Sequence, residues 1–148
     1  MELIYTWSEL KAVQDRIAEI EKESESITDM IIREKRSLTE PERLHRNALW
    51  EEYSELDKKR EEMRKQTIPE VGMPCTVIYY SDRSSAVVTE VRGKAKKEVV
   101  VKQCGIYSST KVFTYRRNGH WVSKGSTSRD WGTLLGIGYQ SDYYDPSY

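Results

Sequence analysis

The spacing of apolar residues changes once along the chain, near Thr67-Ile68-Pro69, and this change constrains the fold more than any other feature. Before it, apolar residues recur every three or four positions, as on one face of an α-helix. After it, they alternate with polar residues or run in short blocks bounded by glycine, which is typical of β-strands. The sequence therefore predicts an α+β protein, with a helical part over residues 1–67 and a β part over residues 68–148.

Two N-terminal capping boxes mark the starts of two helices. Thr6 is followed three residues later by Glu9, and Thr39 is followed in the same way by Glu42. In this arrangement each threonine hydroxyl and each glutamate carboxylate accepts a backbone N–H at the helix start. We expect helices over residues 8–36 and 40–66, joined by a turn at Ser37-Leu38.

The apolar positions of both helices follow a heptad pattern, which predicts an antiparallel coiled-coil hairpin. The expected seam consists of Leu10, Val13, Ile17, Ile20, Ser24, Ile27 and Ile31 in the first helix and Leu49, Tyr53, Leu56, Arg60 and Met63 in the second. Further apolar residues gather off the seam near the closed end: Met30, Ile32, Leu38, Leu44 and Trp50. Trp50 either contacts a partner or folds back on the loop, and a homodimer through the hairpin would cover these residues.

The β part contains six candidate strands separated by turn residues. Their ranges are 75–80, 86–92, 98–103, 111–117, 120–124 and 133–137, and residues 2–5 are a candidate edge strand. Short strands at this spacing indicate a small antiparallel barrel of the Tudor or Src-homology kind, with an oligonucleotide-binding barrel as the alternative.

Asn118-Gly119 predicts a two-residue type I′ turn, and this turn fixes a strand register. The register pairs Trp121 with Arg116, and it places both on the polar outer face of the barrel. An indole there needs a cover, which is either internal, from the C-terminal tail or the hairpin, or an external partner. We expect the internal cover.

Little in the sequence suggests catalysis or cofactor binding. No phosphate-binding glycine loop and no nucleophile elbow is present. His45, His120, Cys75 and Cys104 lack the spacing of metal ligands, and both cysteines are expected to be small core residues. We therefore expect a protein that is not an enzyme and that holds neither metal nor cofactor.

Charge is unevenly distributed although the whole chain is neutral. Residues 1–66 carry 13 Lys and Arg against 17 Asp and Glu, and residues 67–148 carry 11 against 7. The β part is therefore the half that would attract an anionic partner. The candidate nucleic-acid contacts are Lys94, Lys96, Lys97, Lys102, Lys124 and Arg129.

Aromatic residues concentrate in the β part, which holds eight of the ten tyrosines. They either pair across strands and close the barrel with the tail, or they form a surface for protein contact or base stacking. The candidate partner-binding residues are Trp121, Arg116, Arg117, Trp50, Tyr79, Tyr80 and Trp131.

Three motifs of the β part resemble those of a set of small bacteriophage β-barrel proteins. They are YYSD at 79–82, a hairpin of the form F-T-x-R-x-N-G-x-W at 113–121, and a terminal Y-x-D-P at 143–146. The resemblance covers about residues 71–148 and leaves the helical hairpin out. It implies a phage origin and brings no catalytic residues.

The leading functional expectation is a phage accessory protein that binds and modulates a host protein or nucleoprotein, in the specific form of an inhibitor of a defence system such as a CRISPR effector. The first alternative is a nucleic-acid-binding module that uses the basic and aromatic barrel face. The second is an oligomer that sequesters a small nucleotide. The sequence contains no apolar run of 18 residues, and Met1-Glu2-Leu3 lacks the basic start of a signal peptide, so we expect a location in the host cytoplasm, away from the membrane.

Overall fold

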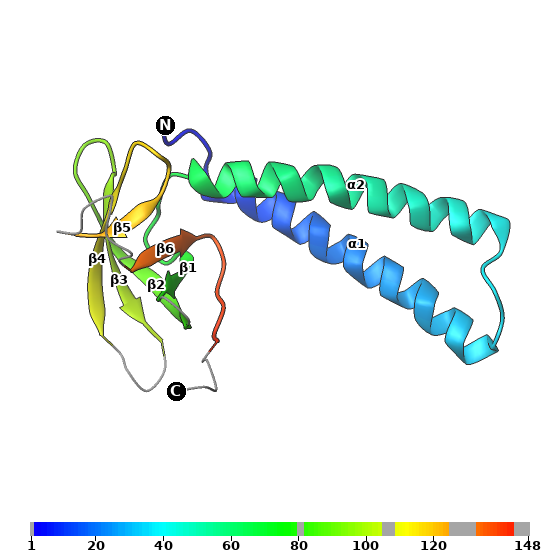
Figure 1. Ribbon diagram of the computed structural model, residues 1–148. Coiled ribbons are helices and arrows are strands. Elements are labelled where there is room, and N and C mark those ends of the chain that lie inside the picture. Colours follow the sequence, from blue (N-terminus) through cyan, green and yellow to red (C-terminus); the bar gives the residue numbers. More distant parts are fainter. Residues whose placement is uncertain (1, 80–81, 105–108, 125–132, 144–148) are drawn as a thin grey trace.

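The computed structural model describes residues 2–79, 82–104, 109–124 and 133–143, and these form a helical hairpin that extends from a small β-barrel (Figure 1). Helix α1 spans Trp7–Glu34 and helix α2 spans Glu40–Lys65. Both predicted capping boxes are confirmed. At the first, the Glu9 amide donates to the Thr6 hydroxyl and the Thr6 amide donates to the Glu9 carboxylate, both at 3.2 Å.

The two helices pack along the seam that the heptad pattern predicts. The buried residues of the helices all belong to it: Leu10, Ile17, Ile20 and Ser24 in α1 and Leu49 and Met63 in α2. Beside the seam, Arg16 donates to both carboxylate oxygens of Glu52, at 2.7 and 2.9 Å. The antiparallel hairpin is thus observed, while its coiled-coil character remains a prediction. Among the described residues, no helix combines the length and the apolar character that crossing a membrane requires.

Six antiparallel strands follow the hairpin and close into a barrel. Their bounds are Pro74–Ile78 for β1, Arg83–Arg92 for β2, Glu98–Gln103 for β3, Thr110–Tyr115 for β4, Trp121–Ser123 for β5 and Leu134–Ile137 for β6. Each strand pairs with the next along the chain, and β6 pairs with β1. The predicted barrel is therefore present, and its assignment to the Tudor or Src-homology kind remains a prediction.

Closure of the barrel leaves no free strand edge, so the edge strand expected at residues 2–5 does not form. Tyr5 instead makes a single parallel bridge with Thr67, where the chain leaves α2. The amides of Ile4 and Tyr5 both donate to the Gln66 carbonyl, at 2.8 and 3.0 Å. These bonds attach the N-terminus to the base of the hairpin.

The turn between β4 and β5 differs from the predicted type I′ turn. The Gly119 amide donates to the Arg116 carbonyl at 3.0 Å, and the Arg116 amide donates to the His120 carbonyl at 2.9 Å. Gly119, with φ of 83°, is the one residue of this turn with positive φ, whereas a type I′ turn requires two. The loop is therefore a type I turn followed by a left-handed glycine, which is one residue longer. Trp121 consequently pairs with Tyr115 in place of Arg116.

This difference in register moves Trp121 to the inside of the barrel, because a shift of one residue turns every side chain to the opposite face. The indole is 2% exposed, and its ring centre lies 5.0 Å from that of Tyr115. The prediction of an outward-facing Trp121 beside Arg116 is therefore wrong. Its cover is internal, as expected, although the cover is the barrel core itself.

The base of the hairpin closes one end of the barrel. Leu10 of α1 and Met63 of α2 are almost completely buried, and both belong to the same apolar cluster as the barrel residues Phe113, Trp121 and Ile137. The predicted boundary near residue 67 thus separates two segments of sequence that share one core.

The segment after β6 runs back along β1 and β2 (Figure 1). The Thr76 hydroxyl donates to the Tyr139 carbonyl at 2.8 Å, and the Ser85 amide and hydroxyl donate to the Asp142 carboxylate at 2.9 and 2.6 Å. Backbone bonds between Tyr143 and Arg83 end the described tail. The barrel is closed by pairing of β6 with β1 rather than by this tail.

Candidate functional site

The residues predicted to contact a partner do not form one surface. Trp121 lies in the core, and Arg116 and Arg117 lie in the β4–β5 turn. Tyr79 lies after β1, and Trp50 lies on α2. Tyr80 and Trp131 lie outside the described residues.

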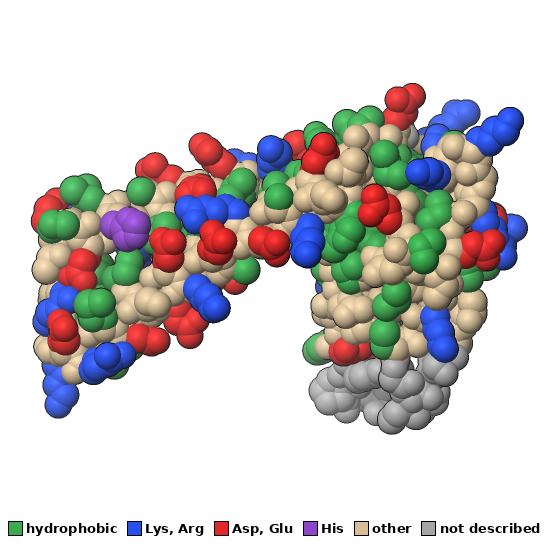
Figure 2. Space-filling view, turned by 180° about the vertical axis from the view of Figure 1, so that it is seen from behind, with side chains coloured by type: hydrophobic (Ala, Val, Ile, Leu, Met, Phe, Trp, Pro, Cys, Tyr) green, Lys and Arg blue, Asp and Glu red, His purple; other side chains and the backbone are tan. Residues whose placement is uncertain are grey.

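The closed end of the hairpin carries four exposed large apolar residues, here called the hairpin tip and defined as Met30, Ile32, Leu44 and Trp50. Their exposed fractions run from 42% to 68%. They are four of the seven large apolar residues that are exposed in the described chain. Apolar side chains gather at this end of the molecule in Figure 2. Trp50 packs edge-on against Tyr53, with ring centres 5.4 Å apart, so a neighbour on its own helix holds the indole.

The candidate nucleic-acid residues also separate. Lys94, Lys96 and Lys97 are exposed together in the β2–β3 turn, whereas Lys102 is exposed near the opposite end of β3. The Lys124 ammonium lies 3.0 Å from the Glu98 carboxylate, which holds the Glu98 pKa below its usual value. Arg129 lies outside the described residues. The three lysines of the turn are the part of this set that the structure brings together.

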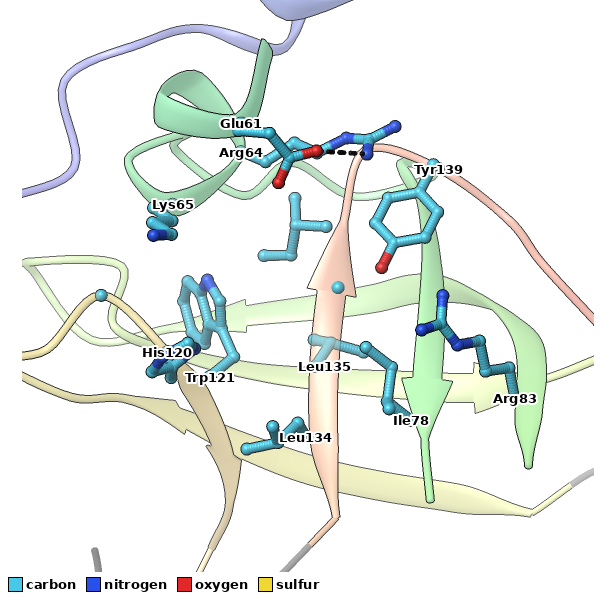
Figure 3. Close-up of a pocket in the computed structure, with 13 residues that line it drawn as sticks. Glu61, Arg64, Lys65, Ile78, Arg83, His120, Trp121, Leu134, Leu135 and Tyr139 are labelled. Carbon is cyan, nitrogen blue, oxygen red and sulfur yellow. Dashed lines mark ion pairs between the residues drawn. The ribbon is translucent and has the colours of Figure 1, made fainter. Parts of the chain in front are cut away.

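A groove of about 440 Å³ lies where the end of α2 meets the outer face of β6 (Figure 3). We call it the junction groove. The residues that line it come from α2, from the β1–β2 region, from the β4–β5 turn and from β6 with the segment after it: Glu61, Arg64, Lys65, Ile78, Arg83, Gly119, His120, Trp121, Leu134, Leu135, Gly136, Ile137 and Tyr139. The groove thus exists only because hairpin and barrel meet.

Arg64 is the most firmly held side chain of the groove. Its guanidinium donates to the Gln14 side-chain oxygen at 2.9 and 3.1 Å and lies 4.1 Å from the centre of the Tyr139 ring. Gln14 in turn donates to the Gly138 carbonyl at 2.8 Å. Burial, with a smaller contribution from nearby Arg60, lowers the pKa of Arg64. Arg64 therefore joins both helices to the segment after β6.

Two glycines allow these close approaches. A Cβ at Gly136 would lie 2.3 Å from the Tyr139 hydroxyl oxygen, so the ring occupies the space that a side chain would fill. A Cβ at Gly138, whose φ is 92°, would lie 2.4 Å from a methyl carbon of Leu10. Gly136 thus has a packing reason to be glycine, and Gly138 has a conformational reason as well.

The opposite end of the barrel interior is polar. Gln103, which is buried, donates to the Tyr79 hydroxyl and accepts from the Ser109 hydroxyl at 3.0 Å. The Lys111 ammonium lies 5.6 Å from the centre of the Tyr79 ring. These contacts are internal, and they occupy the Tyr79 side chain that was predicted to contact a partner.

No group of three or more His, Cys, Asp and Glu side chains within the described ranges is arranged to hold a metal ion. Both cysteines are free thiols. Cys75 is in the core, where burial raises its pKa to about 12 and keeps the thiol protonated at neutral pH. Cys104 is exposed, so the expectation that both cysteines are core residues is wrong for Cys104.

Comparison with models of protein families, with curated proteins and with solved structures finds no match to this chain. The hairpin tip, the exposed lysines of the β2–β3 turn and the junction groove are therefore the candidate sites.

Sequence reasoning missed the groove because its residues are far apart in the chain. Arg64 and Lys65 look like ordinary cations in the last turn of a helix, and Arg83 looks like a turn residue. In the sequence, nothing distinguishes Tyr139 from the other tyrosines of the β part. The usable signal was the pair Gly136 and Gly138, since glycine inside and just after a short strand marks a close approach by another part of the chain.

Proposed function

We propose that this chain is a non-enzymatic binding protein that engages a host protein or nucleoprotein through the hairpin tip and modulates it. The form implied by the bacteriophage resemblance is an inhibitor of a host-defence system, including a CRISPR effector. The observation that carries the proposal is the exposure of Met30, Ile32, Leu44 and Trp50 at the far end of a hairpin that extends away from the barrel (Figures 1 and 2).

Three features of the hairpin support a contact role. Interfaces are enriched in methionine and tryptophan, and both residues occur at the tip. The hairpin is also anchored, because Leu10 and Met63 lie in the barrel core and Arg64 links the two helices to the segment after β6. A rigid arm presents apolar side chains with little loss of conformational entropy on binding. The acidic excess of residues 1–66 suits a basic surface on the partner.

The test is affinity purification from host lysate with three forms of the full chain. The tip variant is Ile32→Asp/Leu44→Asp. The matched control is Ile4→Asp/Val71→Asp, which changes two equally exposed apolar residues away from the tip. We expect wild type and control to retain the same host protein or protein–nucleic acid complex, and the tip variant to lose it. Equal retention by the tip variant would contradict a role for the tip, and recovery of no stable partner by wild type would count against the whole proposal.

Nucleic-acid binding is the second candidate, and it is favoured by the grouping of Lys94, Lys96 and Lys97 in one exposed turn. Phosphate contacts predict that affinity falls steeply as salt rises. Binding of single-stranded and double-stranded oligonucleotides should therefore be titrated at several salt concentrations, with a Lys94→Gln/Lys96→Gln/Lys97→Gln variant beside wild type. Salt-insensitive binding, or none at low salt, would remove this candidate.

A further inference from the structure

The junction groove contains cations that the fold itself does not use. Lys65 and Arg83 are exposed, and neither side chain makes an ion pair with any described residue. In Figure 3 they approach the outer face of β6 from opposite sides. The one carboxylate that lines the groove, Glu61, is already paired with Arg64, at 3.5 Å. The residues that line the groove therefore carry a net positive charge, with Arg64, Lys65 and Arg83 against Glu61.

The position of Lys65 in the last turn of α2 does not explain why this residue is basic. Basic residues often occur there because they interact with the last carbonyl groups. Here two of those groups have other partners: the Met63 carbonyl accepts from the Thr67 hydroxyl, and the Lys65 carbonyl accepts from the Tyr115 hydroxyl. The Lys65 ammonium is thus left available to a ligand.

Between the cations the groove is apolar and flat. Ile78 and Leu134 point outward from paired positions on β1 and β6, and Gly136 adds no side chain of its own. The Tyr139 ring covers Gly136 on the Arg83 side of β6, and His120 lies on the other side (Figure 3). Its volume, about 440 Å³, falls in the range of roughly 300–1,000 Å³ that small-molecule sites occupy.

We propose that the junction groove binds a small molecule in which a phosphate or carboxylate is attached to a planar apolar body. Arg83, which pairs with Ile78 across β1 and β2, binds the anionic group, and the planar body lies on Ile78 and Leu134. Lys65 attracts the anion from the other side of β6. This site is separate from the hairpin tip, so it does not depend on the proposed function.

The test is isothermal titration calorimetry of the full chain at low salt with four probes. Adenosine monophosphate and 2-naphthoate each combine an anion with a planar body, and inorganic phosphate and adenosine supply one half each. The groove variant is Lys65→Met/Arg83→Met, and the control is Lys58→Met/Lys59→Met, which removes the same charge from exposed lysines of α2 that do not line the groove. All four positions are exposed, so folding should be unaffected, and thermal unfolding checks this.

We expect at least one complete probe to bind, and each half-probe to bind about tenfold more weakly. The groove variant should lose about tenfold or more in affinity for the complete probe, and the control should bind as wild type. A response to adenosine monophosphate alone assigns phosphate ligands, and a response to 2-naphthoate alone assigns carboxylates. Absence of saturable binding at millimolar probe, or equal loss in both variants, would overturn the proposal.

Discussion

Gly138 is a residue for which backbone conformation and packing act together. Its φ of 92° is unfavourable for other residues, and the position of a Cβ is already occupied by Leu10. Gly138→Ala should therefore cost about 1–2 kcal/mol for the backbone and about 1–3 kcal/mol more for overpacking. Gly72→Ala is the matched control, because Gly72 has a similar φ of 88° and open space around it. Urea denaturation should show the larger loss at Gly138, and equal losses would mean that packing against Leu10 contributes nothing.

Trp121 belongs to the core, and its truncation should be read as the loss of a core side chain. Trp121→Ala should lower the free energy of unfolding by about 3–5 kcal/mol, because the cavity it leaves is enclosed by the barrel and the hairpin base. Trp50→Ala is the comparison, since Trp50 is 44% exposed and far from that core, and it should cost much less. Thermal unfolding of the two variants measures the difference. A Trp121→Ala protein that melts like wild type would contradict this burial.

At the scale of elements, local signals predicted some features well and one turn wrongly. The capping boxes were predictable because both partners of each box lie within four residues and need nothing else. The dipeptide Asn118-Gly119 is compatible with both a two-residue loop and a three-residue loop, since glycine supplies the left-handed residue in each. The choice between them depends on which face of β5 enters the core. Burial of the Trp121 indole favours the longer loop, and that is tertiary information.

The second capping box should make the stability of the protein depend on pH. The hydrogen bonds from Arg36 and from Thr39 lower the pKa of Glu42 to about 2, against 4.5 for a free side chain. A carboxyl group whose pKa is depressed in the folded state stabilises that state above its unfolded pKa, and the stabilisation is lost as pH falls through the folded pKa. The loss should therefore occur between about pH 4.5 and pH 2.

Urea midpoints at pH 6 and pH 3 measure this loss. In Glu42→Gln the midpoint should already be lower at pH 6, and it should fall less on going to pH 3. Glu51→Gln is the control, because Glu51 is exposed in the same helix and makes no ion pair with the described residues. An unchanged pH dependence in Glu42→Gln would show that the Arg36 and Thr39 contacts do not stabilise the fold.

At the scale of the molecule, the change in hydrophobic period predicted two parts but not how they join. Periodicity reports which face of each element is buried, and it says nothing about which element covers that face. Leu10 and Met63 were predicted to lie on the hairpin seam, and the structure places them in the barrel core as well. The junction groove was unpredictable for the same reason, because it is formed where α2, β6 and the segment after β6 meet.

The shared core predicts that hairpin and barrel unfold together. Leu10→Ala should destabilise the protein by about 2–5 kcal/mol. Far-ultraviolet circular dichroism follows the loss of helix and near-ultraviolet circular dichroism follows the loss of tertiary structure, and the substitution should lower the midpoints of both transitions equally. Ile32→Ala, at an exposed position of the same helix, should change either midpoint little. Separate midpoints for the two signals would show that the hairpin is an independent unit.

The hairpin tip leads to the last prediction, which concerns assembly. A two-helix seam buries one side of each helix, and it leaves Met30, Ile32, Leu44 and Trp50 exposed. In a two-fold dimer each copy supplies the same residues, so one contact covers one side of the tip in both chains and leaves the other side open to a host partner. We expect light scattering at high micromolar concentration to give about twice the chain mass of 17.3 kDa.

Ile32→Asp/Leu44→Asp should return the mass to that of one chain, because a carboxylate buried in an apolar contact has no partner. Ile4→Asp/Val71→Asp should leave the dimer intact. A wild-type protein that scatters as a single chain would reject the dimer, and it would leave the whole tip available to a different partner.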